Sequence, residues 1–542
     1  MNLVKLTLAA VISTVAIMPA TSEAASAERH FVKKLPAVIS SVIPVDKITS
    51  DRILKSAENE ITDPVGKTTI YSRSSIAIAP FDENPLETED YGFAGEIVAG
   101  DNGDVYIKNP FSQLPTGTYL KGTIADDVIS VSLPQNFASL EDEGEVYELY
   151  AYLLDFSDDR SSMVPVENQT LTFVKEDDSW VMTGTAILGL TLEDAKWQGF
   201  GELDMRFDPI DAVAATLPEN AEVSDWVVIS NGAGHNVKLA FDGDKCYLMD
   251  LMQTESGTLA PIAGTKTKTG LVFPSGQYLG VNEDNSYLTY FYAGKVERVY
   301  DSVNNVYVTN FLQEDNLTFT LNADGSYSCD RSALFTPFTD LTHEYFWYMD
   351  LCETPVLRKN NVTDFTPADP SITAYRFYDS LFFGYVSFDI PMLNVDGMLL
   401  DTKKLYYNIY INDSKFTLYP DEYHMLTEEI TDIPYDFTDA HDGLMGDITI
   451  DGSLHTFILF SEGIDNIGIQ SFYVGDDDKV YYSKLVNNSV AGIDTADMVD
   501  CPVLEETYTD LAGRKVAVPG RGVYIKTTRY ADGTVKSEKI AR

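Results

Sequence analysis

The chain has 542 residues and carries 38 lysine and arginine residues against 84 aspartate and glutamate residues, a formal net charge of −46. This charge argues against nucleic acids and anionic membrane surfaces as principal partners, because both reward basic patches. With 27 Phe, 32 Tyr and 4 Trp residues the chain has ample core material. It is expected to fold into three or four domains, at roughly 150 residues each.

The N-terminus has the pattern of a secretory signal peptide. Lys5 precedes an apolar run from Leu6 to Met18, Pro19 breaks that run, and small residues follow. The run is too short to span about 30 Å of hydrocarbon, so we expect cleavage and no transmembrane segment afterwards. Residues 1–27 are predicted to be the signal peptide and residues 28–57 an N-terminal segment.

Short alternating runs separated by turn dipeptides dominate the rest of the chain. Between Lys404 and Asn412, for example, Leu405 and Ile409 share one face while Asn408 lies on the other, an alternation typical of a sheet. Pairs such as Asp242-Gly243 indicate hairpins. The best helical signal is Ser50 to Glu60. We therefore predict an all-β fold of tandem β-sandwich or barrel-like domains.

A diverged internal repeat is present in the first two thirds of the chain. Matching residues recur in the same order at an offset of about 140 residues, which indicates a duplicated domain and not a solenoid. Two homologous β domains are expected, at 58–212 and 213–352. The anchors are Tyr106 with Tyr247, Gly122 with Gly264, Leu133 with Phe273, and Leu171 with Leu317.

A third unit is expected at 353–490, where Pro355, Pro367 and Pro370 punctuate its start. Its layout resembles a fibronectin type III domain, with GYVSFDIP as a second strand, KLYYNIYIND as a third, HTFILFSEG as a sixth and GIQSFYV in the last. The resemblance implies a β-sandwich. An acidic linker is expected at 491–504.

The sign of the charge reverses in the C-terminal segment 505–542. This segment resembles the C-terminal sorting domains of type IX secretion cargo in Bacteroidota, which implies recognition by that secretion machinery. A basic β tail that packs on the acidic body is the alternative. The positions that match the sorting pattern are Tyr508, Gly513, Arg514, Gly522, Tyr524 and Lys539.

The cysteines are far apart and form no Cys-x-x-Cys pair, which argues against a zinc site or a redox motif. Export permits disulfides. We expect a disulfide between Cys246 and Cys329, because both lie in one predicted domain, with buried free thiols as the alternative.

No motif for a familiar chemistry is complete. Gly66-Lys67-Thr68 lacks the first glycine of a phosphate loop, since Ile61 occupies that position, and His343-Glu344 has Trp347 where a zinc protease needs histidine. The histidines are scattered and are interpreted as structural. We therefore assign no catalytic, cofactor-binding or metal-binding residue, and we expect no cofactor.

Two weaker patterns have a structural and a functional interpretation. Acidic loops are interpreted as hairpin turns, with calcium binding as the alternative. Tryptophans and tyrosines are interpreted mainly as core, with a surface platform for sugar rings as the alternative. The residues concerned are Asp242–Asp244, Asn322–Asp324, Asp476–Asp478, Trp180, Trp197 and Trp226.

These features favour an exported, non-catalytic binding protein for a glycan or an extracellular protein. It is expected on the outer-membrane surface or outside the cell, and otherwise in the periplasm. Tandem domains favour binding through avidity. Two alternatives stay open: a structural envelope protein that assembles at sheet edges, and a hydrolase that uses two carboxylates about 5 to 10 Å apart. The hydrolase predicts inward carboxylates with a raised pKa in a concave pocket.

Overall fold

The structure is a computed structural model, and its described elements are almost all β-strands, which confirms the predicted all-β fold class. Two 3₁₀ turns, η3 (Asp101–Gly103) and η4 (Thr402–Lys404), interrupt them. Among the described residues, no helix has the length and apolar character needed to cross a membrane. The structure describes residues 60–81, 84–142, 144–157, 162–257, 259–301, 306–342, 346–378, 383–420, 423, 425–438, 448–459, 464–475 and 478–489, and the backbone of strands at 17–18, 53–54, 503–510, 515–516, 523–530 and 535–541.

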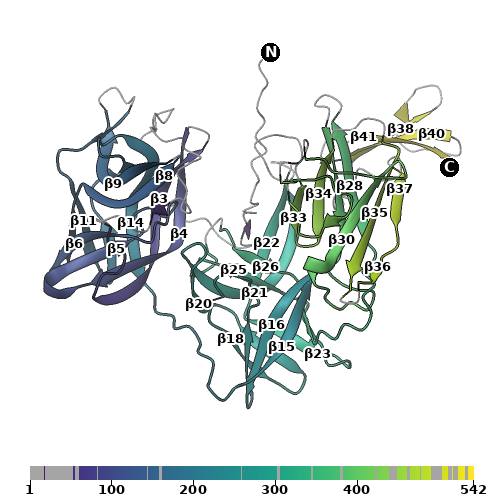
Figure 1. The fold of residues 1–542 in the computed structure, drawn as a ribbon, viewed down its shortest axis with the longest axis horizontal. Helices are drawn as coiled ribbons and strands as arrows, with labels where there is room; N and C mark the ends of the chain where they lie inside the picture. Colours follow the sequence, from purple (N-terminus) through teal and green to yellow (C-terminus); the bar gives the residue numbers. More distant parts are fainter. Residues whose placement is uncertain are drawn as a thin grey trace.

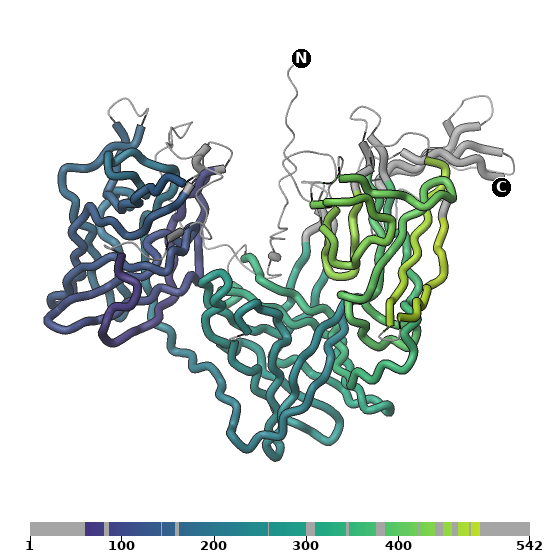
Figure 2. Tube along the Cα trace, viewed as in Figure 1, coloured from purple at the N-terminus to yellow at the C-terminus, as the bar shows by residue number. Residues whose placement is uncertain are grey.

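The first unit is a closed barrel with a second sheet beside it (Figures 1 and 2). The barrel closes because its last strand, β14, pairs with its first, β3, around a core of buried apolar side chains. In pairing order its strands are β3 (Lys67–Phe81), β4 (Asn84–Ala99), β5 (Asp104–Lys108), β6 (Tyr119–Ala125), β7 (Val128–Ser132), β11 (Thr170–Glu176), β12 (Ser179–Met182) and β14 (Trp197–Pro209). The second sheet continues from β14 through β13 (Ile187–Thr191) to β9 (Glu145–Phe156), and both β8 (Gln135–Asp142) and β10 (Met163–Pro165) pair with β9.

The second unit repeats this pairing scheme strand for strand. One difference is that the strand equivalent to β14 is divided into β26 and β27, and β27 lies beyond residue 352. The barrel strands are β15 (Glu222–Ser230), β16 (Ala233–Asp242), β17 (Lys245–Met249), β18 (Ile262–Lys266), β19 (Gly270–Pro274), β23 (Asn316–Leu321), β24 (Tyr327–Ser328) and β27 (Val356–Arg358). The second sheet holds β20 (Gln277–Asn282), β21 (Tyr287–Asp301), β22 (Val306–Glu314), β25 (Ser332–Thr336) and β26 (Asp350–Cys352).

Side-chain hydrogen bonds follow the same repeat. The side-chain amide of Gln135 donates to the carbonyl oxygen of Lys121 at 2.6 Å, and its oxygen accepts from the Lys121 amide at 2.9 Å. Gln277 makes the same two bonds to Ala263, both at 2.9 Å. The two glutamines therefore tie the start of the second sheet to the barrel in the same way.

A shared glycine explains one anchor of the repeat. A Cβ atom on Gly122 would lie 2.7 Å from the carbonyl oxygen of Ser130, and one on Gly264 would lie 2.5 Å from that of Val272. Both contacts involve backbone of the neighbouring strand, which cannot move aside without breaking the ladder. Each barrel thus requires glycine at this position.

Another anchor is displaced. Leu171 pairs with Val131 in the first unit, and Leu317 pairs with Phe273 in the second. If Leu171 corresponds to Leu317, the register makes Phe273 the counterpart of Val131 and not of Leu133.

The prediction of a helix from Ser50 to Glu60 is wrong in the part of that stretch that the structure describes. Strand β2 (Ile53–Leu54) pairs antiparallel with β8 at Leu140 and Ser139. Pairing with a sheet edge outweighs a helical pattern this short. Strand β1 (Ile17–Met18) pairs with β22.

The third unit packs two antiparallel sheets over one apolar core. The segments singled out for the fibronectin type III resemblance contribute strands to both sheets, and the resemblance itself stays a prediction. One sheet holds β28 (Ser371–Tyr378), β29 (Phe383–Asp389), β34 (Leu454–Leu459) and β33 (Ile448–Asp451). The other holds β31 (Ser414–Lys415), β30 (Leu405–Ile411), β35 (Asn466–Val474), β36 (Val480–Tyr482), β32 (Ile433–Pro434) and β37 (Val486–Ser489).

The C-terminal segment forms a small antiparallel sheet. Of the sorting-pattern residues, Tyr508, Tyr524 and Lys539 lie on its strands, whereas Gly513, Arg514 and Gly522 lie outside the described residues. The sorting role stays a prediction. The strands, in sheet order, are β39 (Lys515–Val516), β38 (Val503–Asp510), β40 (Val523–Tyr530) and β41 (Val535–Ala541).

Candidate functional site

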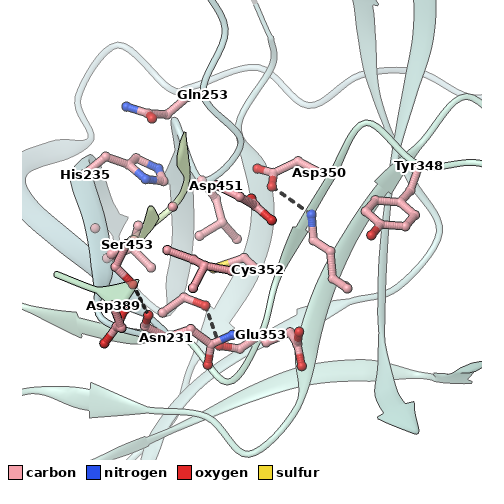
Figure 3. Close-up of a pocket in the computed structure, with 18 of the residues that line it drawn as sticks. Asn231, His235, Gln253, Tyr348, Asp350, Cys352, Glu353, Asp389, Asp451 and Ser453 are labelled. Atoms are coloured by element: carbon pink, nitrogen blue, oxygen red, sulfur yellow. Dashed lines mark hydrogen bonds between the residues drawn. The ribbon is translucent and has the colours of Figure 1, made fainter. Parts of the chain in front are cut away.

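A cavity of about 930 Å³ lies between the second and third units (Figure 3). The second unit supplies the facing ends of β15 and β16 and the segment 348–353. The third unit supplies the start of β28, the end of β29 and the turn between β33 and β34. Cavities of this size at domain boundaries are common ligand sites.

The tip of the β15–β16 hairpin positions the third unit beside the cavity. The Met392 amide donates to the carbonyl oxygen of Gly232 at 3.0 Å, and the Ser453 hydroxyl donates to that of Asn231 at 2.9 Å. Gly232 has φ of 81°, which favours glycine at this tip. The two walls are therefore joined by hydrogen bonds to one tight turn.

Arg298 and Glu353 form a two-pronged ion pair at the cavity wall. The guanidinium nitrogens lie 2.5 and 3.2 Å from the two carboxylate oxygens of Glu353. This hydrogen bonding raises the pKa of Arg298. The Arg298 charge is thus already matched within the wall.

Asp350 is a carboxyl group of the cavity with a raised pKa. Burial raises its pKa to about 6, although the Leu351 amide, which donates to Asp350 Oδ1 at 2.7 Å, acts in the opposite direction. Burial also raises the pKa of the Tyr348 hydroxyl, and the charges of Asp451 and Glu353 raise it further. Tyr348 therefore lies within electrostatic range of Asp350, Glu353 and Asp451.

His235 lines the cavity as a neutral imidazole. Its Nε2 lies 2.9 Å from the carbonyl oxygen of Asp250, and burial lowers the pKa of the ring. Because a carbonyl oxygen only accepts, the proton belongs on Nε2. His235 therefore fixes the loop that follows β17 and adds no positive charge at neutral pH.

The cavity carries a surplus of negative charge. In the part of the chain that the structure describes, Asp350, Asp389 and Asp451 form no ion pair. Figure 3 shows that they come from three separate segments of the chain. With Arg298 matched by Glu353, the field inside the cavity is negative.

The equivalent end of the first barrel is closed by its own side chains. Arg73 and Glu202 form an ion pair at 2.9 Å, and both side chains are fully buried. Arg73 also donates to the carbonyl oxygens of Asn109 and Pro110 at 2.7 and 3.0 Å. The amide of Ser112 donates to Glu202 at 2.6 Å.

Strand register maps this cluster onto the cavity. All but one of the residues in the first unit's ion-pair cluster have counterparts that line the cavity in the second unit. The exception is the counterpart of Asn109, which is Asp250, and its carbonyl oxygen is bound by His235. The open end of the second barrel is therefore structurally equivalent to the closed end of the first. The counterparts are Val228 for Arg73, Cys352 for Glu202, His235 for Phe93, Asp250 for Asn109, Leu251 for Pro110 and Gln253 for Ser112.

The predicted cysteine pair is not formed. Cys246 and Cys329 are buried free thiols, and burial raises the pKa of the Cys329 thiol to about 11. Both pack among apolar side chains of the second core, where a thiol behaves as a small apolar group. The expected disulfide is therefore corrected to the free-thiol alternative.

The other sequence candidates are structural where the structure describes them. Trp180, Trp197 and Trp226 are buried and form no surface platform. Asp242–Asp244 and Asn322–Asp324 form tight turns. No group of three or more potential metal ligands occurs among the described residues.

The sequence analysis missed the cavity residues because they come from distant segments. The charged residues of the cavity wall belong to no local motif, and its aspartates and glutamate are a few among 84 acidic residues in the chain. Only the alignment of the two repeats offered a signal, since Val228 occupies the position that Arg73 has in the first unit. The chain was compared with protein-family models and with curated proteins, and neither comparison finds a match.

Proposed function

We propose that this chain is an exported binding protein of the cell surface, non-catalytic, whose ligand site is the cavity between the second and third units. The observation that supports it most is the cavity of about 930 Å³ with hydrogen-bonding groups on both walls. Its size suits a sugar or a short peptide segment, in keeping with a glycan or extracellular protein as ligand.

The test is binding of the purified chain to arrays of glycans and extracellular proteins. Ser371 is exposed and lines the cavity, so Ser371→Trp is expected to fill the site without disturbing the core. Ser414→Trp, on the exposed strand β31, is the matched control. Binding that Ser371→Trp abolishes and Ser414→Trp preserves supports the proposal, whereas silence of the wild-type chain on both arrays contradicts it.

A carboxylate-dependent hydrolase is the second candidate, favoured by Asp350. An acid with a pKa of about 6 inside a cavity is what a general acid requires, and Asp451 would be its partner. Incubation with chromogenic glycosides tests this candidate. Turnover that Asp350→Asn abolishes, with ligand binding retained, would replace the binding proposal by the enzymatic one.

Delivery to the surface is a separate part of the proposal. It is supported by the leader pattern and by the sorting-like tail. Deleting residues 505–542 is expected to leave the protein in the periplasm, detected by protease accessibility of whole cells. Unchanged delivery would remove the sorting role and would leave the cavity proposal intact.

A further inference from the structure

The chemistry of the ligand follows from the charge of the cavity and from its counterpart in the first unit. Asp389 and Asp451 come from the third unit and Asp350 from the second, so carboxylates face the cavity from both walls. Arg298, the basic side chain in the described lining, is held by both oxygens of Glu353. An anionic ligand would meet repulsion and find no free cation.

The first unit shows independently what this end of the barrel accommodates. There the guanidinium of Arg73 is buried, over the ring of Phe93 at 5.2 Å and against the carboxylate of Glu202. The second unit has Val228 and Cys352 at the corresponding positions, so it has no equivalent of the Arg73 guanidinium or of the Glu202 carboxylate. The carboxylates at this end come instead from Asp350 on β26 and from Asp389 and Asp451 of the third unit.

The lining also offers neutral hydrogen-bonding groups. Gln253, Ser371 and Thr373 border the cavity with amide and hydroxyl groups. Groups of this kind suit hydroxyls on a ligand. Resting on the proposed binding function, we propose that the cavity takes a small polyhydroxylated primary amine, such as an amino sugar, with its ammonium group facing Asp350, Asp389 and Asp451.

Calorimetric titration with sugars that differ in charge tests the proposal. The probes are glucosamine, its neutral relatives N-acetylglucosamine and glucose, and the anion glucuronate. Glucosamine is expected to bind at least about tenfold more tightly than glucose, and glucuronate most weakly, with the preference for glucosamine falling as salt rises.

Two variants locate the charge effect. Asp389→Asn and Asp451→Asn are each expected to weaken glucosamine binding by about fivefold to tenfold, and to weaken glucose binding less, since glucose carries no positive charge. Asp211→Asn removes an exposed carboxylate of the linker between the first two units and is the control. Equal losses in all three variants would show a general charge effect and would overturn the assignment.

The outcomes separate this inference from the function on which it rests. If glucose or glucuronate binds as tightly as glucosamine, the ligand class is wrong and the binding function stands. If none of the four probes binds while the arrays give a signal that Ser371→Trp abolishes, the ligand class is again wrong. If the arrays are silent as well, the binding function fails together with this inference.

Discussion

The two barrels share a pairing scheme, a bridging glutamine and an obligatory glycine, yet their equivalent ends have opposite character. The first is closed by the buried pair of Arg73 and Glu202, and the second opens into a cavity. Strand register is set by the backbone ladder and its small-residue contacts, which both units keep. The end of the barrel depends on a few side chains, so it diverged without disturbing the ladder.

The closed end also contributes to the joint between the two units. Asp90 accepts hydrogen bonds from the Tyr287 hydroxyl at 2.9 and 3.0 Å, and Phe93 on the same strand pairs with Tyr287. The first barrel's end therefore stabilises the arrangement of the chain. The second barrel's end contacts the third unit instead, through Asn231 and Gly232, and it is the end that carries the cavity.

The largest effect is expected from removing one partner of the buried ion pair that closes the first barrel. Glu202→Gln leaves the Arg73 guanidinium buried without its counter-ion, and a loss of about 3–5 kcal/mol in unfolding free energy is expected. Calorimetry of the full chain would show the first unit's transition at a lower temperature.

The double variant Arg73→Val with Glu202→Cys is the control, since it installs the residues of the second unit. Removing both charges together is expected to cost less than Glu202→Gln alone, because the guanidinium is removed together with the carboxylate that pairs with it. A double variant that is less stable than the single one would contradict the role given to the ion pair.

At the open end of the second barrel, the buried carboxyl group of Asp350 allows a matching test of stability. Its raised pKa means that the neutral form favours the folded state, and this contribution is complete below pH 3.8 and is lost as pH rises through about 6. Asp350→Asn is therefore expected to stabilise the chain by about 2–3 kcal/mol at pH 7.5 and to have no effect near pH 3.8.

Thermal unfolding across this pH range measures the effect, with Asp211→Asn as a control of equal charge change. A stabilisation by Asp350→Asn that does not vary with pH would contradict the burial of this carboxyl group.

The shared glycines test whether the two ladders are equivalent. Gly122→Ala and Gly264→Ala each place a Cβ against a backbone oxygen, and each is expected to cost about 1–3 kcal/mol through overpacking. Gly117→Asn is the control, because Gly117 has φ of 77° and open space around it, a conformation that asparagine tolerates. A cost in one barrel and none in the other would break the equivalence.

The all-β class and the repeat were predictable because alternation and turn chemistry are local signals. Leu405 and Ile409, for instance, are buried on one face of β30 as their spacing predicts. The cavity was not predictable, since Asp350, Asp389 and Asp451 meet only after two units dock. The disulfide prediction was wrong because shared domain membership says nothing about where two thiols point.

Hydrogen exchange of backbone amides with and without glucosamine tests the central claim most directly, since it reports on both barrel ends in one experiment. The account predicts slower exchange at 228–235, 348–353 and 451–454 around the open end, and no change at 71–73 and 109–112 around the closed end. Equal protection at both ends, or protection confined to the closed one, would contradict it.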